Sequence, residues 1–262
     1  MEKTVTDNPM SPHYVPEEYQ TPYDVVDLPS QGLLYKNNKK TVKLEFLTAM
    51  DETILSSPNL INSSKFVDVL LSRKVKELGF DTLDMLEGDR AALLLYLRIG
   101  GFGSDYTQNV YDPDEGKILP SQVNLTEVKL KKLEVKPDAN NEFDFVMPMS
   151  KQKIKFRLLT GRDEQVIDEQ DSVLRTKDED EDISHKLLLR LERQIMSIDG
   201  EKDKIKISNL IKRLPIRDSR ALRSYVTEVE PGIDLNVIAR TPGGGSVTTF
   251  LRFNTSFFWP EL

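Results

Sequence analysis

The sequence predicts an α+β fold made of two related halves. Two stretches, VKLEFLTAMDETIL at 42–55 and IKFRLLTGRDEQVI at 154–167, each join an alternating apolar pattern to a helix start. Two more, EGDRAALLLYLRI at 87–99 and IRDSRALRSYVTE at 216–228, follow in the same order and show helical periodicity. Turn-rich tails come after both of these, as expected for short antiparallel hairpins rather than for crossover connections.

Each stretch of the first pair is expected to form a strand, a cap and a helix. Apolar and charged residues alternate across 42–46 and 154–158, which is the period of a half-buried strand. A threonine then precedes an aspartate by three positions, and these residue types suit the free N–H groups and the positive end of a first helical turn. The two caps are Thr48 with Asp51 and Thr160 with Asp163.

The second pair predicts two helices that differ in burial. An aspartate stands near each start, Asp89 or Asp218, where an N-cap is expected. Alanine, leucine and tyrosine recur on one face of both helices. The earlier helix also carries Leu94 and Leu95 where the later one is polar. The earlier helix should therefore be buried nearly all round, and the later one half exposed.

We interpret this repeated order as internal duplication of a strand–helix–helix–hairpin module, with convergence on common strand-to-helix patterns as the alternative. The polar loop DANNEF at 138–143 places the modules at 27–140 and 141–262. Residues 1–26 are rich in proline and poor in aliphatic side chains. They are expected to form an extended N-terminal arm.

Extra residues in the second half predict a further helix. The stretch ISHKLLLRLERQI at 183–195 spaces Ile183, Leu187, Leu191 and Ile195 by four positions, which is one helical face. The acidic run KDEDED precedes this stretch, where negative charge suits the helix dipole.

The composition excludes several classes of function. The chain has 262 residues, a formal charge of −7 and a pI near 5.1, unlike the basic footprint of a nucleic-acid binder. It has no cysteine, so a disulfide framework, a thiolate zinc site and a cysteine nucleophile are excluded. His13 and His185 are far apart in sequence and are interpreted as surface residues. No apolar run is long enough to span a membrane, and the charged start is not a signal peptide.

No arrangement of residues points to catalysis. The sequence has no GxSxG, HExxH or paired histidine–carboxylate signature. Carboxylate pairs such as Asp51 and Glu52 are explained by helix starts. Two alternatives remain: a hydrolase or transferase with an unrecognised site, and a nucleic-acid adaptor suggested by the basic run IKRLPIRDSR at 211–220. No metal and no cofactor is expected.

The apolar segments at the two ends supply the candidate partner-binding residues. DLPSQGLLY at 27–35 follows the arm, and FFWPEL occupies 257–262. Aromatic residues dominate interface hot spots, so both segments are candidate contact sites. For the second segment, a last strand that closes the core is the alternative. The candidates are Leu28, Leu33, Leu34, Tyr35, Phe257, Phe258, Trp259 and Pro260.

Four segments, taken together, carry a family resemblance. They are LPSQGLLY (28–35), LTAMDETILSSPNLI (47–61), EGDRAALLLYLRIGGFGSDY (87–106) and FFWPEL (257–262). In this order they resemble the baseplate hub protein family of T-even-type contractile-tailed bacteriophages. That family has a Leu-Pro-Ser-x-Gly box, a Leu-Thr-x-x-(Asp/Glu)-Glu-x-Ile-Leu segment, a Gly-Asp-Arg helix ending in a glycine turn, and a Phe-Phe-x-Pro end.

The resemblance implies a non-enzymatic structural role in the central hub of a contractile tail baseplate. The implied partners are other baseplate and tail-tube proteins. The implied location is the tail baseplate of the virion, after synthesis in the bacterial host cytoplasm. A transient hub assembly factor that is absent from the mature particle is the alternative. No membrane, specific nucleic acid or small-molecule substrate is expected.

The chain departs from the family at two turns. Many family members carry Cys-x-x-Cys knuckles, which could share a zinc ion, where this chain has YDPDEGK at 111–117 and RTPGGGS at 240–246. Without cysteine, neither turn is expected to bind metal. Hairpin geometry alone is then expected to hold both turns.

Overall fold

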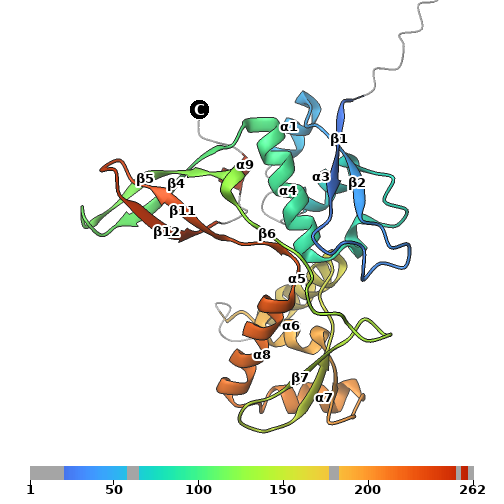
Figure 1. The fold of residues 1–262 in the computed structure, drawn as a ribbon. Helices are drawn as coiled ribbons and strands as arrows, with labels where there is room; N and C mark the ends of the chain where they lie inside the picture. Colours follow the sequence, from blue (N-terminus) through green and yellow to red (C-terminus); the bar gives the residue numbers. More distant parts are fainter. Residues whose placement is uncertain (1–20, 58–64, 177–182, 252–254, 259–262) are drawn as a thin grey trace, which may run out of the picture.

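Helices and small antiparallel sheets make up the described part of the chain, which confirms the α+β prediction (Figure 1). One hydrophobic core runs through both halves of the sequence. All strand pairs among the described residues are antiparallel, as predicted. The structure is a computed structural model that describes residues 21–57, 65–176, 183–251 and 255–258.

The first half forms a three-stranded sheet and the helices that pack on it. Val42 and Leu44 point into the core and are almost fully buried, so the alternating pattern forms the predicted strand. The elements in chain order are β1 (Tyr23–Asp27), β2 (Thr41–Glu45), α1 (Ala49–Leu55), α3 (Phe66–Lys74), β3 (Val75–Lys76), the 3-10 helix η1 (Thr82–Asp84) and α4 (Glu87–Phe102).

The second half forms a similar set of elements. Ile154 and Phe156 are buried on its middle strand. The predicted cap is present in both halves, because the Thr48 N–H donates to Asp51 Oδ2 at 2.8 Å and the Thr160 N–H donates to Asp163 Oδ2 at 3.0 Å. The elements are β7 (Phe143–Val146), β8 (Lys153–Phe156), α5 (Gly161–Arg175), α6 (Lys186–Gln194), β9 (Ile195–Ile198), α7 (Lys204–Ile211) and α8 (Ile216–Val229).

The two halves share the connections of their sheets. In each, a hairpin is followed by a capped helix and by a nine-residue helix, α3 or α6. That second helix runs straight into a third strand, which pairs with the second strand of the hairpin. At this junction the Val75 N–H bonds to the Leu71 carbonyl, and the Ile195 N–H bonds to the Leu191 carbonyl.

A four-stranded sheet joins the tails of the two halves. The predicted hairpins are present in both tails and pair in the order β12–β11–β5–β4, so strands from either side of residue 140 share one sheet. Figure 1 shows this sheet reaching away from the helices. β6 and β10 form a further pair between the tails. The elements are β4 (Asp105–Asp112), β5 (Lys117–Asn124), η2 (Leu125–Glu127), β6 (Leu130–Lys131), β10 (Gly232–Ile233), β11 (Asn236–Arg240) and β12 (Ser246–Phe250).

The two long helices differ in burial as predicted, but their starts differ from the prediction. α4 is buried on several sides, whereas α8 buries one face. Asp89 and Asp218 are not N-caps. They are the third residues of α4 and α8, whose N-caps are Leu86 and Pro215. Each aspartate instead accepts hydrogen bonds from a distant loop, which the sequence spacing did not reveal.

The helix predicted at 183–195 is shorter than expected. Ile183 precedes α6 and is exposed, and Ile195 begins β9 and is fully buried. Leu187 is also exposed, so only Leu191 of the predicted face is buried on the helix. Ile195 therefore matches the four-residue spacing of the helix by coincidence, because it is the first residue of the following strand.

The start of the described chain changes the predicted arm. Residues 23–26 belong to β1 and pair with β2. Residues 1–20 lie outside the described residues, so the extended arm stays a prediction.

Candidate functional site

A buried polar cluster ties the Leu-Pro-Ser loop to the start of α4. Asp89 is fully buried and accepts hydrogen bonds from the Ser30 N–H at 2.8 Å, the Ser30 hydroxyl at 2.6 Å and the Tyr35 hydroxyl at 2.6 Å. The Tyr35 oxygen accepts from the Leu86 N–H at 2.9 Å. Burial raises the pKa of Asp89, although the hydrogen bonds from Ser30 and Tyr35 oppose that change. Burial and the Asp89 charge raise the pKa of Tyr35.

The candidate contact residues of this segment therefore divide into two groups. Leu28 and Tyr35 are buried in the core of the chain itself. Leu34 is partly buried against that core. Leu33 remains 44% exposed. A partner role at this end of the chain stays a prediction, for which Leu33 is the accessible residue.

The rest of the Gly-Asp-Arg motif joins the two halves. A methyl group on Gly88 would lie 1.6 Å from the Pro231 carbonyl oxygen, so α4 and the segment before β10 approach through their backbones. Arg90 is buried and forms an ion pair with Asp68. A methyl group on Gly161, the first residue of α5, would lie 2.6 Å from the guanidinium carbon of Arg90. Of the three consecutive motif residues, Gly88 thus contacts a distant backbone segment, Asp89 holds the Leu-Pro-Ser loop, and Arg90 forms an ion pair.

The helix starts of the two halves also pair directly. Leu86 and Thr160, the N-caps of α4 and α5, form an isolated antiparallel bridge. This pairing satisfies backbone groups that a helix start would otherwise leave free. The two hydrogen bonds run from the Glu87 N–H to the Leu159 carbonyl (3.2 Å) and from the Gly161 N–H to the Met85 carbonyl (3.1 Å).

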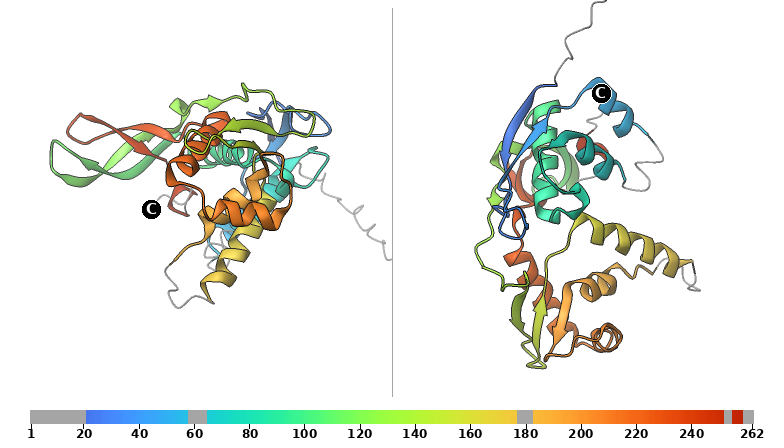
Figure 2. Two further views of the ribbon diagram at one scale, coloured as in Figure 1. Left: turned by 90° about the horizontal axis from the view of Figure 1, so that it is seen from below. Right: turned by 90° about the vertical axis from the view of Figure 1, so that its right-hand side faces the viewer.

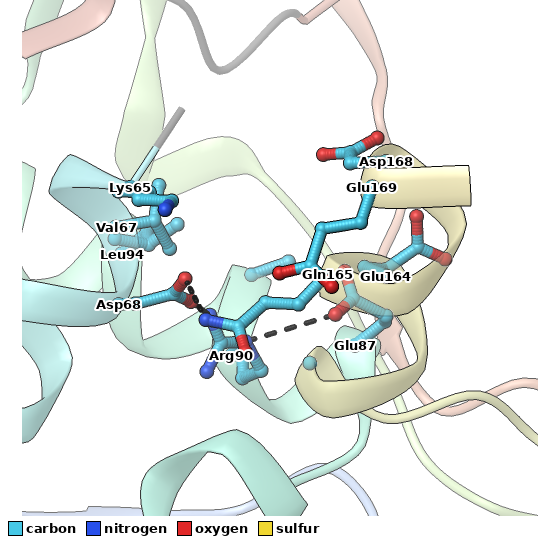
Figure 3. A pocket seen from close by; sticks show the side chains of 12 residues that line it. Lys65, Val67, Asp68, Glu87, Arg90, Leu94, Glu164, Gln165, Asp168 and Glu169 are labelled. Carbon is cyan, nitrogen blue, oxygen red and sulfur yellow. Dashed lines mark hydrogen bonds and ion pairs between the residues drawn. The ribbon is translucent and has the colours of Figure 1, made fainter. Parts of the chain in front are cut away.

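A pocket of about 270 Å³ lies beside this junction and is lined by acidic side chains (Figure 3). Arg90 lies between Asp68 and Glu87, and Glu164 comes from the facing helix. Burial raises the pKa of Glu87 to about 7, and it also raises the pKa of Glu164. Glu230, the C-cap of α8, has its pKa raised to about 7 by burial.

A carboxyl group that is protonated near neutral pH can act as a general acid. Raised pKa values also occur in structural networks of charges. Here the three carboxyl groups lie at the packed ends of α4, α5 and α8, and arginines offset their charge: Arg90 beside Glu87, and Arg190, which pairs with Glu164 at 2.6 Å. The three carboxyl groups therefore belong to the packed junction between the halves.

The Glu87→Gln substitution should change how stability depends on pH. The folded protein keeps the Glu87 proton up to about pH 7, whereas the unfolded chain loses it near the ordinary value of 4.5. Stability should therefore fall as the pH rises through this window. The Glu87 side chain is 34% exposed, so solvent screening limits the effect, and we expect Glu87→Gln to gain about 1 kcal/mol at pH 8 and little at pH 5.

Urea denaturation at both pH values checks this prediction. Glu52→Gln removes one exposed carboxyl group on the first turn of α1 and is the matched control. A Glu87→Gln profile that stays parallel to that of the wild type would contradict the prediction.

The described part of the second apolar segment, Phe257 and Phe258, is also buried, and an arginine binds its backbone. Phe257 and Phe258 lie in the short helix α9 (Thr255–Phe258) and are almost fully buried. The Arg98 Nε donates to the Phe257 carbonyl at 2.5 Å, and its Nη1 donates to the Gly103 carbonyl at 2.8 Å. Burial lowers the pKa of Arg98. Phe257 and Phe258 therefore close the core from a helical turn rather than from the last strand that was the alternative prediction.

Sequence reasoning missed Arg98, although a signal was present. It stands among apolar residues of a helix that was expected to be buried, and a buried arginine needs carbonyl or carboxylate partners. The rings of Phe257 and Tyr106 lie 5.3 Å apart beside it. Trp259 and Pro260 lie outside the described residues, so their partner role stays a prediction.

The two turns that lack cysteine form hairpins. Residues 113–116 connect β4 to β5, and residues 241–245 connect β11 to β12. Gly116 and Gly244 adopt positive φ angles of 66° and 84°, which these turns require. Within the described ranges, no group of three or more histidine, aspartate or glutamate residues is arranged to hold a metal ion. No helix in these ranges is long and apolar enough to cross a membrane.

Exposed apolar side chains occur on two other surfaces. One is the outer face of the four-stranded sheet, where Tyr111 and Ile118 are direct cross-strand neighbours. The other is the start of α8, where Ile216 is 78% exposed. Arg217 and Arg220 follow Ile216 in α8, and neither forms an ion pair with another described residue.

Comparison with known proteins identifies the family. A family model described as T4 bacteriophage base plate protein matches residues 22–259. No curated protein and no solved structure matches the chain. The matched region contains the buried Asp89 clamp, the junction between the halves and the Arg98 anchor. The chain belongs to the T4 bacteriophage base plate protein family.

Proposed function

We propose that this protein is a non-enzymatic structural component of the central hub of a contractile phage tail baseplate. Its location is then the tail of the virion, and its partners are other baseplate and tail-tube proteins. The observation that carries the proposal is the family match, which spans nearly the whole chain. The family segments that the structure describes pack against other parts of the same chain. This is expected of a protein whose task is to hold a shape.

Exposed apolar surfaces support partner binding. The outer face of the four-stranded sheet presents Tyr111, Ile118, Ile238 and Phe250 to solvent. Leu33 is the exposed member of the N-terminal segment. Large exposed apolar side chains on one sheet face are typical of protein–protein contact sites. A hub role gives these residues a use that the fold itself does not require.

Quantitative mass spectrometry of purified particles beside the infected-cell lysate tests this proposal. A structural hub protein is retained in intact particles at fixed stoichiometry, together with hub proteins in isolated baseplates. Peptides that are abundant in the lysate but missing from particles would favour the transient assembly factor instead. Absence from both precursor complexes and particles would contradict the proposal.

We further propose that the two halves, 27–140 and 141–262, arose by duplication. The shared sheet connections and capped helices support this relation. The two aspartates support it too. Asp89 binds the loop between β1 and β2, and Asp218 accepts from the Met149 and Ser150 N–H groups in the loop between β7 and β8. The same helix position therefore clamps the same hairpin loop in each half.

A further inference from the structure

The junction between the two halves uses one helix start from each half. The corresponding helix start on the other half is not part of a junction in either case. The junction pairs the start of α4 with the start of α5 through the Leu86–Thr160 bridge. In the proposed duplication, the start of α8 corresponds to that of α4, and the start of α1 corresponds to that of α5. Residues 214–216 therefore correspond to 85–87, and residues 47–49 correspond to 159–161.

The backbone groups at these counterparts are free. Within the described ranges, none of the four groups that would make the same bridge has a hydrogen-bond partner. Each of the two places also has an exposed apolar side chain, since Ile216 is 78% exposed and Met50 is 65% exposed. Met85, Leu86 and Leu159 are buried in the existing junction. The four free groups are the Ile216 N–H, the Leu47 carbonyl, the Ala49 N–H and the Leu214 carbonyl.

We propose that a second copy of this chain occupies these surfaces, so that the start of α8 in one copy pairs with the start of α1 in the next. The inference rests on the proposed duplication, and not on the hub role. Inside the chain, one half covers the helix start of the other half. The same kind of contact can form between the halves of two different copies. Terminal modules of repeat proteins usually carry polar caps, whereas these two ends expose Ile216 and Met50.

The residues at the counterpart positions are compatible with the bridge. Pro215 replaces Leu86, and the Leu86 N–H takes no part in the bridge because it donates to Tyr35. A proline without an N–H group therefore costs nothing at this position. Ala49 takes the place of Gly161, and Ser219 takes the place of Arg90.

This last pair of replacements is mutually consistent. The large Arg90 leaves no room for a side chain on Gly161. The small Ser219 leaves room for the methyl group of Ala49. The two exchanges together remove the steric conflict, although the small pair fills the space between the facing positions less than Arg90 does in the junction.

The ion pairs of the junction have no equivalent at the counterpart positions, and one of the two contacts becomes apolar. Arg162 in α5 pairs with Asp84 at 2.6 Å and with Asp81 at 3.1 Å. Met50 stands at the position of Arg162. Its facing counterparts are Arg213 for Asp84 and Leu210 for Asp81. Leu210 is partly exposed, so Met50 gains an apolar neighbour in place of an ion pair.

One counterpart sets a limit on the approach. Arg217 stands where Gly88 touches the Pro231 carbonyl. A side chain at this position excludes the same close backbone contact with the neighbouring copy. The proposed interface therefore consists of the bridge and the apolar contacts of Met50 and Ile216, and it should be weaker than the junction inside the chain.

The two surfaces lie at opposite ends of the molecule. Figure 1 shows α1 at the top and α8 in the lower part, and the right view of Figure 2 keeps them apart in the same way. Pairing between different surfaces is heterologous, so it builds a ring if the rotation closes and an open chain if it does not. Association should therefore increase with concentration and extend beyond a dimer.

Sedimentation velocity of the full chain, from about 1 to about 200 µM, tests the proposal in the range of weak protein contacts. The wild type should associate. Met50→Arg places an arginine opposite Arg213 and should weaken association by about tenfold. A mixture of Met50→Arg and Arg213→Asp chains should recover association, because it recreates the pair that Arg162 and Asp84 form inside the chain.

Controls separate this result from misfolding and from other contacts. Ile238→Asp, at an exposed isoleucine on the sheet face, should leave association unchanged. Circular dichroism and thermal unfolding confirm that each variant is folded. A wild type that stays monomeric to the highest concentration overturns the proposal. So does association that ignores both substitutions, or a mixture that recovers nothing. None of these failures bears on the particle composition that tests the hub role.

Discussion

Asp89→Ala is expected to destabilise the protein by about 3 kcal/mol or more. The substitution removes three hydrogen bonds to a buried carboxylate and leaves the Ser30 N–H and the two hydroxyl groups without their acceptor. Hydrogen bonds to charged groups contribute about 1.5–3 kcal/mol each, and unsatisfied buried partners add a cost. The loop between β1 and β2 should also lose its attachment to α4.

Urea denaturation, followed by tryptophan fluorescence and circular dichroism, measures this effect. Asp24→Ala is the matched control, because Asp24 is an exposed aspartate of the same half. It should change the free energy of unfolding by less than about 0.5 kcal/mol. Asp218→Ala gives a second comparison. It should cost less than Asp89→Ala, because Asp218 is bound by Met149 and Ser150 alone and has no equivalent of the Tyr35 hydroxyl that donates to Asp89. Equal losses for Asp24 and Asp89 would contradict the assignment of the clamp.

Gly88→Ala is the second substitution with a large expected effect. The added methyl group would lie 1.6 Å from the Pro231 carbonyl oxygen and 2.7 Å from the Pro231 carbonyl carbon. Both atoms are backbone, so no side chain can rotate away. To make room for the methyl group, α4 must move away from the segment before β10. This movement would separate the two halves at their junction. Overpacking typically costs about 1–3 kcal/mol, and a clash with backbone atoms is expected at the upper end of this range.

A second glycine in the same helix gives a sharp control. A methyl group on Gly100 would meet the Phe46 ring at 3.4 Å, which is close to ordinary contact. Alanine is the better helix former by about 1 kcal/mol, so Gly100→Ala should be neutral or slightly stabilising. The two variants change the same helix by the same methyl group. Similar unfolding free energies for both would show that the contact between Gly88 and Pro231 does not hold the halves together.

Local features of this protein could be predicted from residue order alone. The alternating pattern at 42–46 gave a strand, and Thr48 with Asp51 gave a helix start. Both features depend on residues a few positions apart, and their physical causes act over the same short range. The turns at 113–116 and 241–245 were predictable for the same reason, because glycine and proline restrict the backbone locally.

The roles of the motif residues were not predictable in this way. Asp89 has the residue type and approximate position of an N-cap, yet its acceptors serve Ser30 and Tyr35, which lie more than fifty residues away. Phe257 looks like a surface anchor in the sequence, yet Arg98 and the core cover it. In each case the neighbouring sequence suggests one role for an aromatic or charged side chain, and contacts with distant residues give it another. Only the tertiary structure shows which distant residues it contacts.

The sequence by itself determined the α+β class, the repeated strand, cap and helix, and the two hairpins, because these follow from periodicity and from the conformational limits of single residues. Only the tertiary structure decided that the hairpins share one sheet, that the Gly-Asp-Arg motif joins the halves and that Leu28, Tyr35, Phe257 and Phe258 are buried. Those outcomes depend on the free energy of contacts between distant segments, where burial and hydrogen-bond satisfaction outweigh local preference.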